Sequence, residues 1–300
     1  MRWCKVKRVL FVAIFIMSLS RVSYADYIVK LNGDVTKFDD TKIECILNDW
    51  FLVESLDNLD VSYVQENYTY KTCDAEALEQ NKTVILTNTD MSVLADKVPK
   101  DKVTVAILDT GVDISNEKLT KYIVGGYNAM EKNALVKDDC GHGTHVSGIV
   151  VGLSGSRIMP VKVLNEEGVG KSADIAIGIR WAVDMDAKVL NLSLGGAKYD
   201  RLLEEAVDYA VKRGCVVVCA SGNTYGEKKI YPACLKNTIS VGAVDKGYNI
   251  SPYSNRGDGV DVYAIGDVTS YGLDGGYERR CGTSMACAVV TAEIALLLGK

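Results

Sequence analysis

Apolar segments alternate with amphipathic ones through the last two thirds of the chain. Five runs are apolar at nearly every position, at residues 103–108, 157–164, 188–194, 215–220 and 238–244. Helical periodicity lies between them, at residues 143–151, 172–184 and 201–212. Strands that are apolar on both faces are typical of a parallel sheet, because helices cover both of its sides. The pattern therefore predicts an α/β fold, with a parallel sheet covered by helices on both faces, over residues 102–300.

A smaller pattern precedes this domain. Residues 27–31, 50–55 and 61–65 alternate between apolar and polar positions, which predicts strands in a small α+β module over residues 26–72. Fewer than fifty residues bury little apolar surface, so the module is expected to need a partner. Residues 73–101 are polar and irregular, and we interpret them as a linker with a processing site.

The first 25 residues have the pattern of a signal peptide. Four basic residues lie within residues 2–8, an apolar run follows at residues 9–19, and Ser23-Tyr24-Ala25 supplies small residues for cleavage. The alternative is a membrane anchor, but the apolar run is too short to cross about 30 Å of hydrocarbon as a helix. We therefore expect a secreted protein without a stable membrane anchor.

Charge limits the classes of molecule that the chain can bind, and cysteine content bears on its disulfides. The chain carries a formal net charge of −5, which becomes −10 once a leader with five basic and no acidic residues is removed. An acidic chain is a poor partner for nucleic acid or an anionic membrane, so neither is expected. Eight of the nine cysteines remain after the leader, which permits disulfides in an exported protein and leaves their pairing open.

Candidate chemistry gathers in a few glycine-flanked phrases. The chain has two histidines, and both lie in Gly141-His142-Gly143-Thr144-His145. Asp109 ends a predicted strand, and Ser284 opens the apolar run that ends the chain. An acid, an imidazole and a hydroxyl suggest a Ser/His/Asp hydrolase. His142, placed between glycines at a helix entry, is the expected base, and His145 is expected to be a packed or capping residue.

Asn223 and Ser284 are candidates for stabilising a carbonyl oxygen as it becomes negative. Asn223 follows a buried strand, where its amide can donate, and the Ser284 N–H lies at the positive end of a helix. Each residue alone has a structural alternative: Asn in a left-handed turn, and Ser as a helix cap. Together with the other phrases, the catalytic interpretation is favoured.

Two other chemistries were weighed against this interpretation. Asp109-Thr110-Gly111 is the phrase of an aspartic protease, which needs a second carboxylate and belongs to an all-β fold. Cys140 beside His142 and His145 could suggest zinc, but no His-Glu-x-x-His is present. The sequence favours neither, and we predict no metal and no cofactor.

These phrases together resemble the subtilisin family of serine proteases. Asp109, His142 and Ser284 occur in the chain order of that family. Further phrases follow in order: Val161-Lys-Val-Leu, Asn191-Leu-Ser-Leu-Gly-Gly, Tyr231-Pro-Ala, Ser240-Val-Gly-Ala-Val and Ser254-Asn-Arg-Gly. The resemblance covers roughly residues 100–300. It implies a subtilisin-like fold and an endopeptidase that forms an acyl-enzyme on Ser284, with Asn223 and the Ser284 N–H as the oxyanion hole.

The resemblance also implies a substrate site and a zymogen. Its pocket walls are matched by two segments, which are Ser193, Leu194, Gly195 and Gly196, and Ala220, Ser221 and Gly222. Such glycine-rich walls would permit a medium or large apolar side chain. The module at residues 26–72 resembles the family's propeptide, which implies an intramolecular inhibitor that is cut off.

Some features depart from the family pattern. The connection between residues 151 and 158 leaves little room for the calcium loop of bacterial members, so a structural calcium site is not predicted. The sequence stops 16 residues after Ser284, which indicates a domain truncated at its C-terminus or an abbreviated fold. We expect a monomer that acts on peptides or proteins; the alternative is a catalytically silent binding protein with the same fold.

Overall fold

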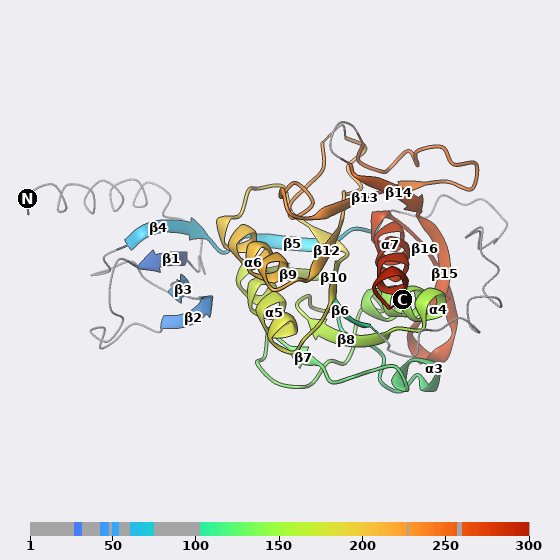
Figure 1. Ribbon diagram of the computed structural model, residues 1–300, viewed down its shortest axis with the longest axis horizontal. Helices are drawn as coiled ribbons and strands as arrows, with labels where there is room; N and C mark the ends of the chain where they lie inside the picture. The colour runs from blue at the N-terminus through green and yellow to red at the C-terminus, as the bar shows by residue number, and fades with distance from the viewer. Residues whose placement is uncertain are drawn as a thin grey trace, which may run out of the picture. The chain divides into compact units, whose positions relative to one another are not determined.

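The computed structural model describes residues 27–31, 43–47, 50–53, 61–74, 103–226, 228–256 and 260–299 (Figure 1). The chain divides into two compact units, residues 1–68 and 69–300. The expected signal peptide lies outside the described residues, as does the expected linker apart from Cys73 and Asp74. The predicted module boundary at residue 72 stays a prediction.

The first unit contains a four-stranded sheet. Its order is β2 (Ile43–Leu47), β3 (Trp50–Val53), β1 (Tyr27–Leu31) and β4 (Val61–Glu66), with antiparallel pairs throughout. Val29, Phe51 and Val53 form its buried cluster. The three predicted strands correspond to β1, β3 and β4, while any helical part of the predicted module lies outside the described residues.

A seven-stranded parallel sheet forms the centre of the second unit. Its order is β14 (Val262–Ile265), β13 (Ile239–Val244), β12 (Val216–Ala220), β10 (Val189–Leu192), β6 (Thr104–Asp109), β8 (Arg157–Lys162) and β7 (Tyr127–Asn128). Strands β6, β10, β12 and β13 are buried at almost every position, because side chains on both faces meet helices. The predicted α/β class is confirmed.

Helices cover both faces of this sheet. Helices α5 (Ser172–Asp184) and α6 (Arg201–Lys212) pack together on one side, and α4 (His142–Ser154) packs with α7 (Thr283–Leu298) on the other (Figure 1). A short helix, α3 (Glu117–Thr120), contacts α4. Helices α5 and α6 have the predicted bounds, and α6 ends before Gly214, whose φ of +82° is the left-handed conformation expected there.

One predicted strand is divided in the structure. Residues 188–194 form β10 and, after Ser193, a separate strand β11 (Leu194–Gly195). Strand β11 leaves the large sheet and joins β5 (Thr69–Thr72) and β9 (Val169–Lys171) in a three-stranded antiparallel sheet. The division arises because the main chain at Ser193 turns to bond residues outside the large sheet, as the site below shows.

The remaining elements pack beside α4 and α7. Strands β15 (Asp267–Tyr271) and β16 (Tyr277–Cys281) form an antiparallel hairpin around a 3₁₀ turn at Leu273–Gly275. Helix α7 itself is buried at every residue from 283 to 292, which makes it a central helix rather than an amphipathic one.

Seven cysteines of the second unit are free thiols. They are Cys73, Cys140, Cys215, Cys219, Cys234, Cys281 and Cys287. Burial raises the pKa of Cys287 to about 12, so that side chain behaves as a small apolar group. Within the described part of the chain, no helix is both long and apolar enough to cross a bilayer.

We predict that Gly143→Ala destabilises the second unit. A Cβ at residue 143 would overlap the carbonyl oxygen of Gly111 and lie 3.2 Å from Asp109 Cβ, so the first turn of α4 would have to move. Overpacking of this kind costs about 2–3 kcal/mol, which lowers the melting temperature by about 4–12 °C. Thermal melts followed by circular dichroism measure this shift.

Gly276→Ala is the matched control. Its φ is −75°, and nothing lies within 4 Å of the position that a Cβ would occupy. Its melting temperature is expected to stay within about 2 °C of the parent. Equal melting temperatures for both variants would contradict the close seating of α4 on the turn after β6.

Candidate active site

Asp109 and His142 meet at the carboxyl ends of the parallel strands. Asp109 is the last residue of β6, and His142 is the first of α4, directly after Gly141 in a left-handed conformation (φ +88°). His142 Nδ1–H donates to Asp109 Oδ1 at 2.6 Å, and neither side chain is exposed. The Thr110 N–H donates to the same oxygen at 2.7 Å. The carboxylate therefore fixes the orientation of the imidazole and stabilises its charged form.

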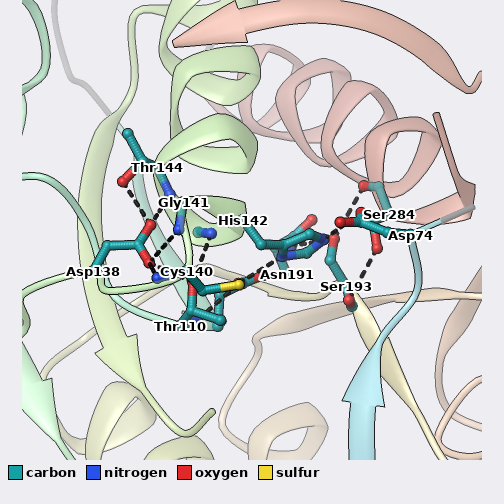
Figure 2. Close-up of polar contacts among 12 residues, drawn as sticks. Asp74, Thr110, Asp138, Cys140, Gly141, His142, Thr144, Asn191, Ser193 and Ser284 are labelled. Carbon is teal, nitrogen blue, oxygen red and sulfur yellow. Dashed lines mark hydrogen bonds and ion pairs between the residues drawn. The ribbon is translucent and has the colours of Figure 1, made fainter. Parts of the chain in front are cut away.

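A buried carboxylate, Asp138, holds the turn that carries His142. Its side chain accepts hydrogen bonds from the N–H groups of Cys140, Gly141 and Thr144 and from the hydroxyls of Thr110 and Thr144 (Figure 2). Burial by itself would raise the pKa of Asp138, but these hydrogen bonds outweigh it and hold the pKa below its ordinary value. Asp138 thus links the turn after β6 to the first turn of α4.

Ser284 begins the buried helix α7 beside the end of β10. Its hydroxyl donates to the carbonyl oxygen of Ser193 at 3.0 Å, and the Ser193 hydroxyl donates back to the carbonyl of Ser284 at 3.0 Å (Figure 2). Asn191 Nδ2 donates to Ser193 Oγ at 2.9 Å, while its Oδ1 accepts from Thr291 Oγ1 and Cys287 Sγ. Reciprocal bonds of this kind fix the first turn of α7 against β10.

Asn223 and the Ser284 N–H point at one carbonyl oxygen. Both Asn223 Nδ2 and Ser284 N donate to the main-chain oxygen of Cys73, the latter at 3.3 Å. Asn223 Oδ1 accepts from the N–H of Thr283 at 3.0 Å, and the Gly222 N–H donates to Thr283 Oγ1 at 3.2 Å. The amide of Asn223 is therefore oriented by the same helix terminus that carries Ser284. Two converging donors are the arrangement that stabilises a developing oxyanion.

The segment that contains Cys73 lies in the site as an extended strand. Strand β5 pairs with β11 on one side and β9 on the other, both antiparallel. The N–H of Cys73 donates to the carbonyl of Ser193 at 3.2 Å, and the N–H of Thr72 donates to Gly168 at 3.0 Å. Added-strand pairing is one of the ways in which proteins hold an extended peptide. Residues 69–74 therefore lie as an extended, paired strand that places the Cys73–Asp74 bond beside Ser284.

Asp74 pairs with the free side of the His142 ring. Its Oδ1 lies 3.1 Å from His142 Nε2, and its Oδ2 lies 2.9 Å from Arg280 Nη1. Burial alone would lower the pKa of His142, but the charges of Asp109 and Asp74 outweigh it and raise the pKa well above its ordinary value. Likewise, burial would raise the pKa of Asp74, but the charges of His142 and Arg280 outweigh it and hold that pKa low. The two carboxylates thus favour the charged form of the His142 ring.

His145 has a different environment, one turn further along α4. Its Nε2–H donates to the carbonyl of Glu278 at 3.0 Å, and the ring is buried. Burial lowers the pKa of His145 to about 4, so the ring is neutral near pH 7. Since the two histidines turn to different partners, their roles are distinct. Among the described residues, no group of three or more His, Cys, Asp or Glu side chains is placed to hold a metal ion.

One of the two predicted pocket walls pairs directly with β5. Leu194 and Gly195 pair with Thr72 and Lys71, and Gly196 packs against the Tyr70 ring. The other wall follows β12 and consists of Ala220, Ser221 and Gly222, which are buried. The structure joins Asp109 to His142, and Asn223 and Ser284 to the Cys73 carbonyl, but the Ser284 hydroxyl donates to Ser193 while His142 Nε2 pairs with Asp74.

Sequence patterns missed several residues that contact the site. Asp74, Arg280, Asp138, Asn191 and Ile230 belong to segments whose local pattern is ordinary. Asn191 could have been noticed, because a polar side chain within an apolar strand run needs a buried partner. For Asp74 and Arg280, which are 206 residues apart, no local signal exists.

An acid, an imidazole and a hydroxyl at one end of a parallel sheet are the groups that a Ser/His/Asp hydrolase uses. The model of the subtilase family matches residues 100–300, so the chain belongs to this family. It is 39% identical over 208 residues to the thermophilic serine proteinase of Bacillus sp. (strain AK1), over 65% of this chain and 52% of that protein. It is 37% identical over 208 residues to thermitase of Thermoactinomyces vulgaris, over 65% of this chain and 75% of thermitase.

A third relative is subtilisin BL of Lederbergia lenta. It is 37% identical over 209 residues, which cover 66% of this chain and 77% of subtilisin BL. The chain thus spans about half the length of the thermophilic serine proteinase and about three quarters of the other two. The similarity to each covers about two thirds of this chain.

We predict two separate histidine titrations in a Ser284→Ala chain, which keeps residue 284 small and removes its hydroxyl. His142 should titrate well above pH 6.5, because two carboxylates stabilise its cation, whereas His145 should stay neutral until about pH 4. The His142 pairing stabilises the fold fully below about pH 6.5, and this contribution is lost as pH rises through the raised pKa. Imidazole proton shifts in NMR measure both titrations.

Asp74→Asn should lower the His142 pKa and shift that of His145 far less, because only His142 contacts the carboxylate and the charge of Asp74 acts on His145 from a distance. Asp139→Asn is the matched control: Asp139 also lies near this turn, but its carboxylate pairs with Lys137 at 3.0 Å. A His142 titration that Asp74→Asn does not move would disprove the ion pair.

Proposed function

We propose that this protein is a serine endopeptidase in which Asp109, His142 and Ser284 form the catalytic triad. Ser284 Oγ attacks the carbonyl carbon of the scissile bond, and its proton passes to His142 Nε2. His142 then gives that proton to the leaving amine as the carbon–nitrogen bond breaks. A water molecule hydrolyses the resulting acyl-enzyme on Ser284 and releases a carboxylic acid. Asp109 orients the imidazole throughout.

The oxyanion of each tetrahedral intermediate would be held by Asn223 Nδ2 and the Ser284 N–H. The observation that carries the proposal is that both groups already donate to one peptide carbonyl, that of Cys73. A silent binding protein has no need to aim two donors at a carbonyl beside a buried serine hydroxyl. The substrates would be extended peptides or protein segments, because β9 and β11 pair with β5 along its length.

The same contacts support a zymogen that inhibits and then cuts itself, and the predicted signal peptide would make it a secreted one. Residues 69–74 fill the substrate place, so no other peptide can enter until they leave. Self-cleavage at the Cys73–Asp74 bond would release the leading module, in keeping with the predicted signal peptide and propeptide. Asp74 must first leave His142 Nε2, because this nitrogen takes the Ser284 proton. The first cut is therefore expected to be slow relative to later peptide turnover.

Ser284→Ala should abolish both peptide hydrolysis and labelling by a fluorophosphonate, because the nucleophile is removed. The wild-type chain should acquire a new N-terminus at Asp74, read by N-terminal sequencing, whereas Ser284→Ala should keep the intact precursor. Ser147→Ala is the control: Ser147 is a buried serine on α4 and is expected to keep labelling and cleavage.

Three outcomes separate the hypotheses. If the wild-type chain is not labelled and does not cleave any peptide of a random library, the result would favour the catalytically silent binding protein. Cleavage that persists in Ser284→Ala would assign the nucleophile elsewhere. Hydrolysis of peptides with a new N-terminus away from residue 74 would keep the endopeptidase and reject the proposed self-cleavage bond.

Asn223→Ala should lower kcat while leaving KM nearly unchanged, because its donor acts most strongly on the oxyanion. Loss of the matching donor in subtilisin lowers kcat by about 10²–10³, and we expect a similar factor here. Initial rates on a peptide substrate measure it. Asn237→Ala, which removes an exposed hydrogen bond to Asp208, is the control. A loss confined to KM would contradict the oxyanion role.

A further inference from the structure

We propose that Ile230 restricts this enzyme to substrates with a small side chain immediately before the scissile bond, such as cysteine, alanine or serine. The inference rests on the proposed function and names the substrate class of that site. It arises from the contacts of one half-buried isoleucine with both predicted pocket walls.

The side chain of Ile230 lies between the two glycine walls. A Cβ on Gly222 would lie 2.8 Å from Ile230 Cδ1 and 2.9 Å from Cγ1, and a Cβ on Gly195 would overlap the same Cδ1. One side chain therefore touches both walls at the positions where their own side chains are missing. Glycine-rich walls by themselves would leave room for a medium or large apolar group, but here Ile230 occupies that room.

Main-chain hydrogen bonds hold Ile230 in this position. Its N–H donates to the carbonyl of Ser221 at 3.1 Å, in one wall. The next residue, Tyr231, exchanges two hydrogen bonds with Gly196 at 2.8 and 2.9 Å, in the other wall. Because these bonds fix the backbone of residues 230 and 231 to both walls, the main chain at Ile230 cannot move away from the pocket without breaking them. A rigid group in a pocket excludes larger side chains more strongly than a mobile one.

The residue immediately before the bond beside Ser284 is small. The Cys73 side chain is buried, and both Cys73 and Ala220 belong to the large buried cluster against which Ile230 packs. Cys73 is also the residue whose carbonyl meets Asn223 and Ser284, so it stands immediately before the bond beside the nucleophile. A cysteine side chain is little larger than that of alanine and far smaller than phenylalanine. The occupant and the pocket therefore match in size.

The first test compares the hydrolysis of matched peptides. The complete chain is produced and assayed after its self-cleavage has run to completion. Internally quenched peptides Tyr-Lys-Thr-Xaa-Asp repeat residues 70–74, with alanine, serine, leucine or phenylalanine at Xaa. We expect kcat/KM to be at least about 100-fold higher for alanine than for phenylalanine, since a few misfitting methylene groups already give factors of this size. Ile230→Gly should raise the phenylalanine rate at least about 10-fold and change the alanine rate little.

Ile239→Ala is the matched control, because Ile239 is also a partly buried isoleucine against the same cluster but lies at the opening of β13. It should keep the wild-type preference. Equal rates on alanine and phenylalanine in the wild type would overturn the size restriction. An unchanged preference in an Ile230→Gly enzyme that still cleaves alanine peptides would overturn the role of Ile230. A wild type without hydrolysis of any peptide would instead overturn the proposed function, and this inference with it.

A second test uses the chain as its own substrate and does not depend on how well Ile230→Gly is produced. Cys73→Ala should still cut itself, and Cys73→Phe should accumulate as precursor, because phenylalanine does not fit beside Ile230. Combining Cys73→Phe with Ile230→Gly or Ile230→Ala should restore the cut. Self-cleavage of Cys73→Phe at the wild-type rate, followed by gel electrophoresis, would overturn the proposal.

Discussion

The hydrogen bonds of Asn191 are the interaction on which the arrangement of the site depends. Helix α7 is buried around its whole circumference from residue 283 to 292, so hydrophobic burial alone does not decide its rotation about its own axis. A buried polar side chain must find partners, and Asn191 finds them in Thr291 and Cys287 on α7 and in Ser193. These directional bonds fix one rotation of the helix, and that rotation sets the hydroxyl and N–H of Ser284 toward the turn after β10.

From that fixed point the rest of the site follows through main-chain contacts. Thr283 orients the amide of Asn223, while Ser193 binds both Ser284 and the N–H of Cys73. On the other side, Asp138 holds the first turn of α4, so His142 meets Asp109. The segment at residues 69–74 joins these two halves. Its carbonyl meets the donors of one half, and its Asp74 carboxylate meets the imidazole of the other. The same segment that meets the two donors also favours the charged form of His142, through the carboxylate of Asp74.

Patterns along the chain predicted the large sheet, helices α5 and α6, and candidate residues at the carboxyl ends of the strands. Local apolar periodicity identifies strands that are buried on both faces and helices that are amphipathic. Asp109 lies at the end of one such strand and Asn223 follows another, and the carboxyl ends of parallel strands share one edge of the sheet. The patterns failed where a strand changes partner: residues 188–194 read as one strand, but Ser193 turns out of the sheet and Leu194–Gly195 pairs with β5. Periodicity records that a residue is buried and not which strand it pairs with.

The sequence by itself determined the α/β class, and it singled out the candidate acid, imidazole and hydroxyl and predicted different roles for His142 and His145. Only the tertiary structure decided which residues these groups contact. Asp74 and Arg280, and likewise Cys73 and Asn223, are far apart in the sequence and meet only because the strand order places them together. The pocket shows the same limit. Its glycine walls can be read from the chain, but Ile230 fills it from a third segment, and the size of a cavity depends on every side chain that enters it.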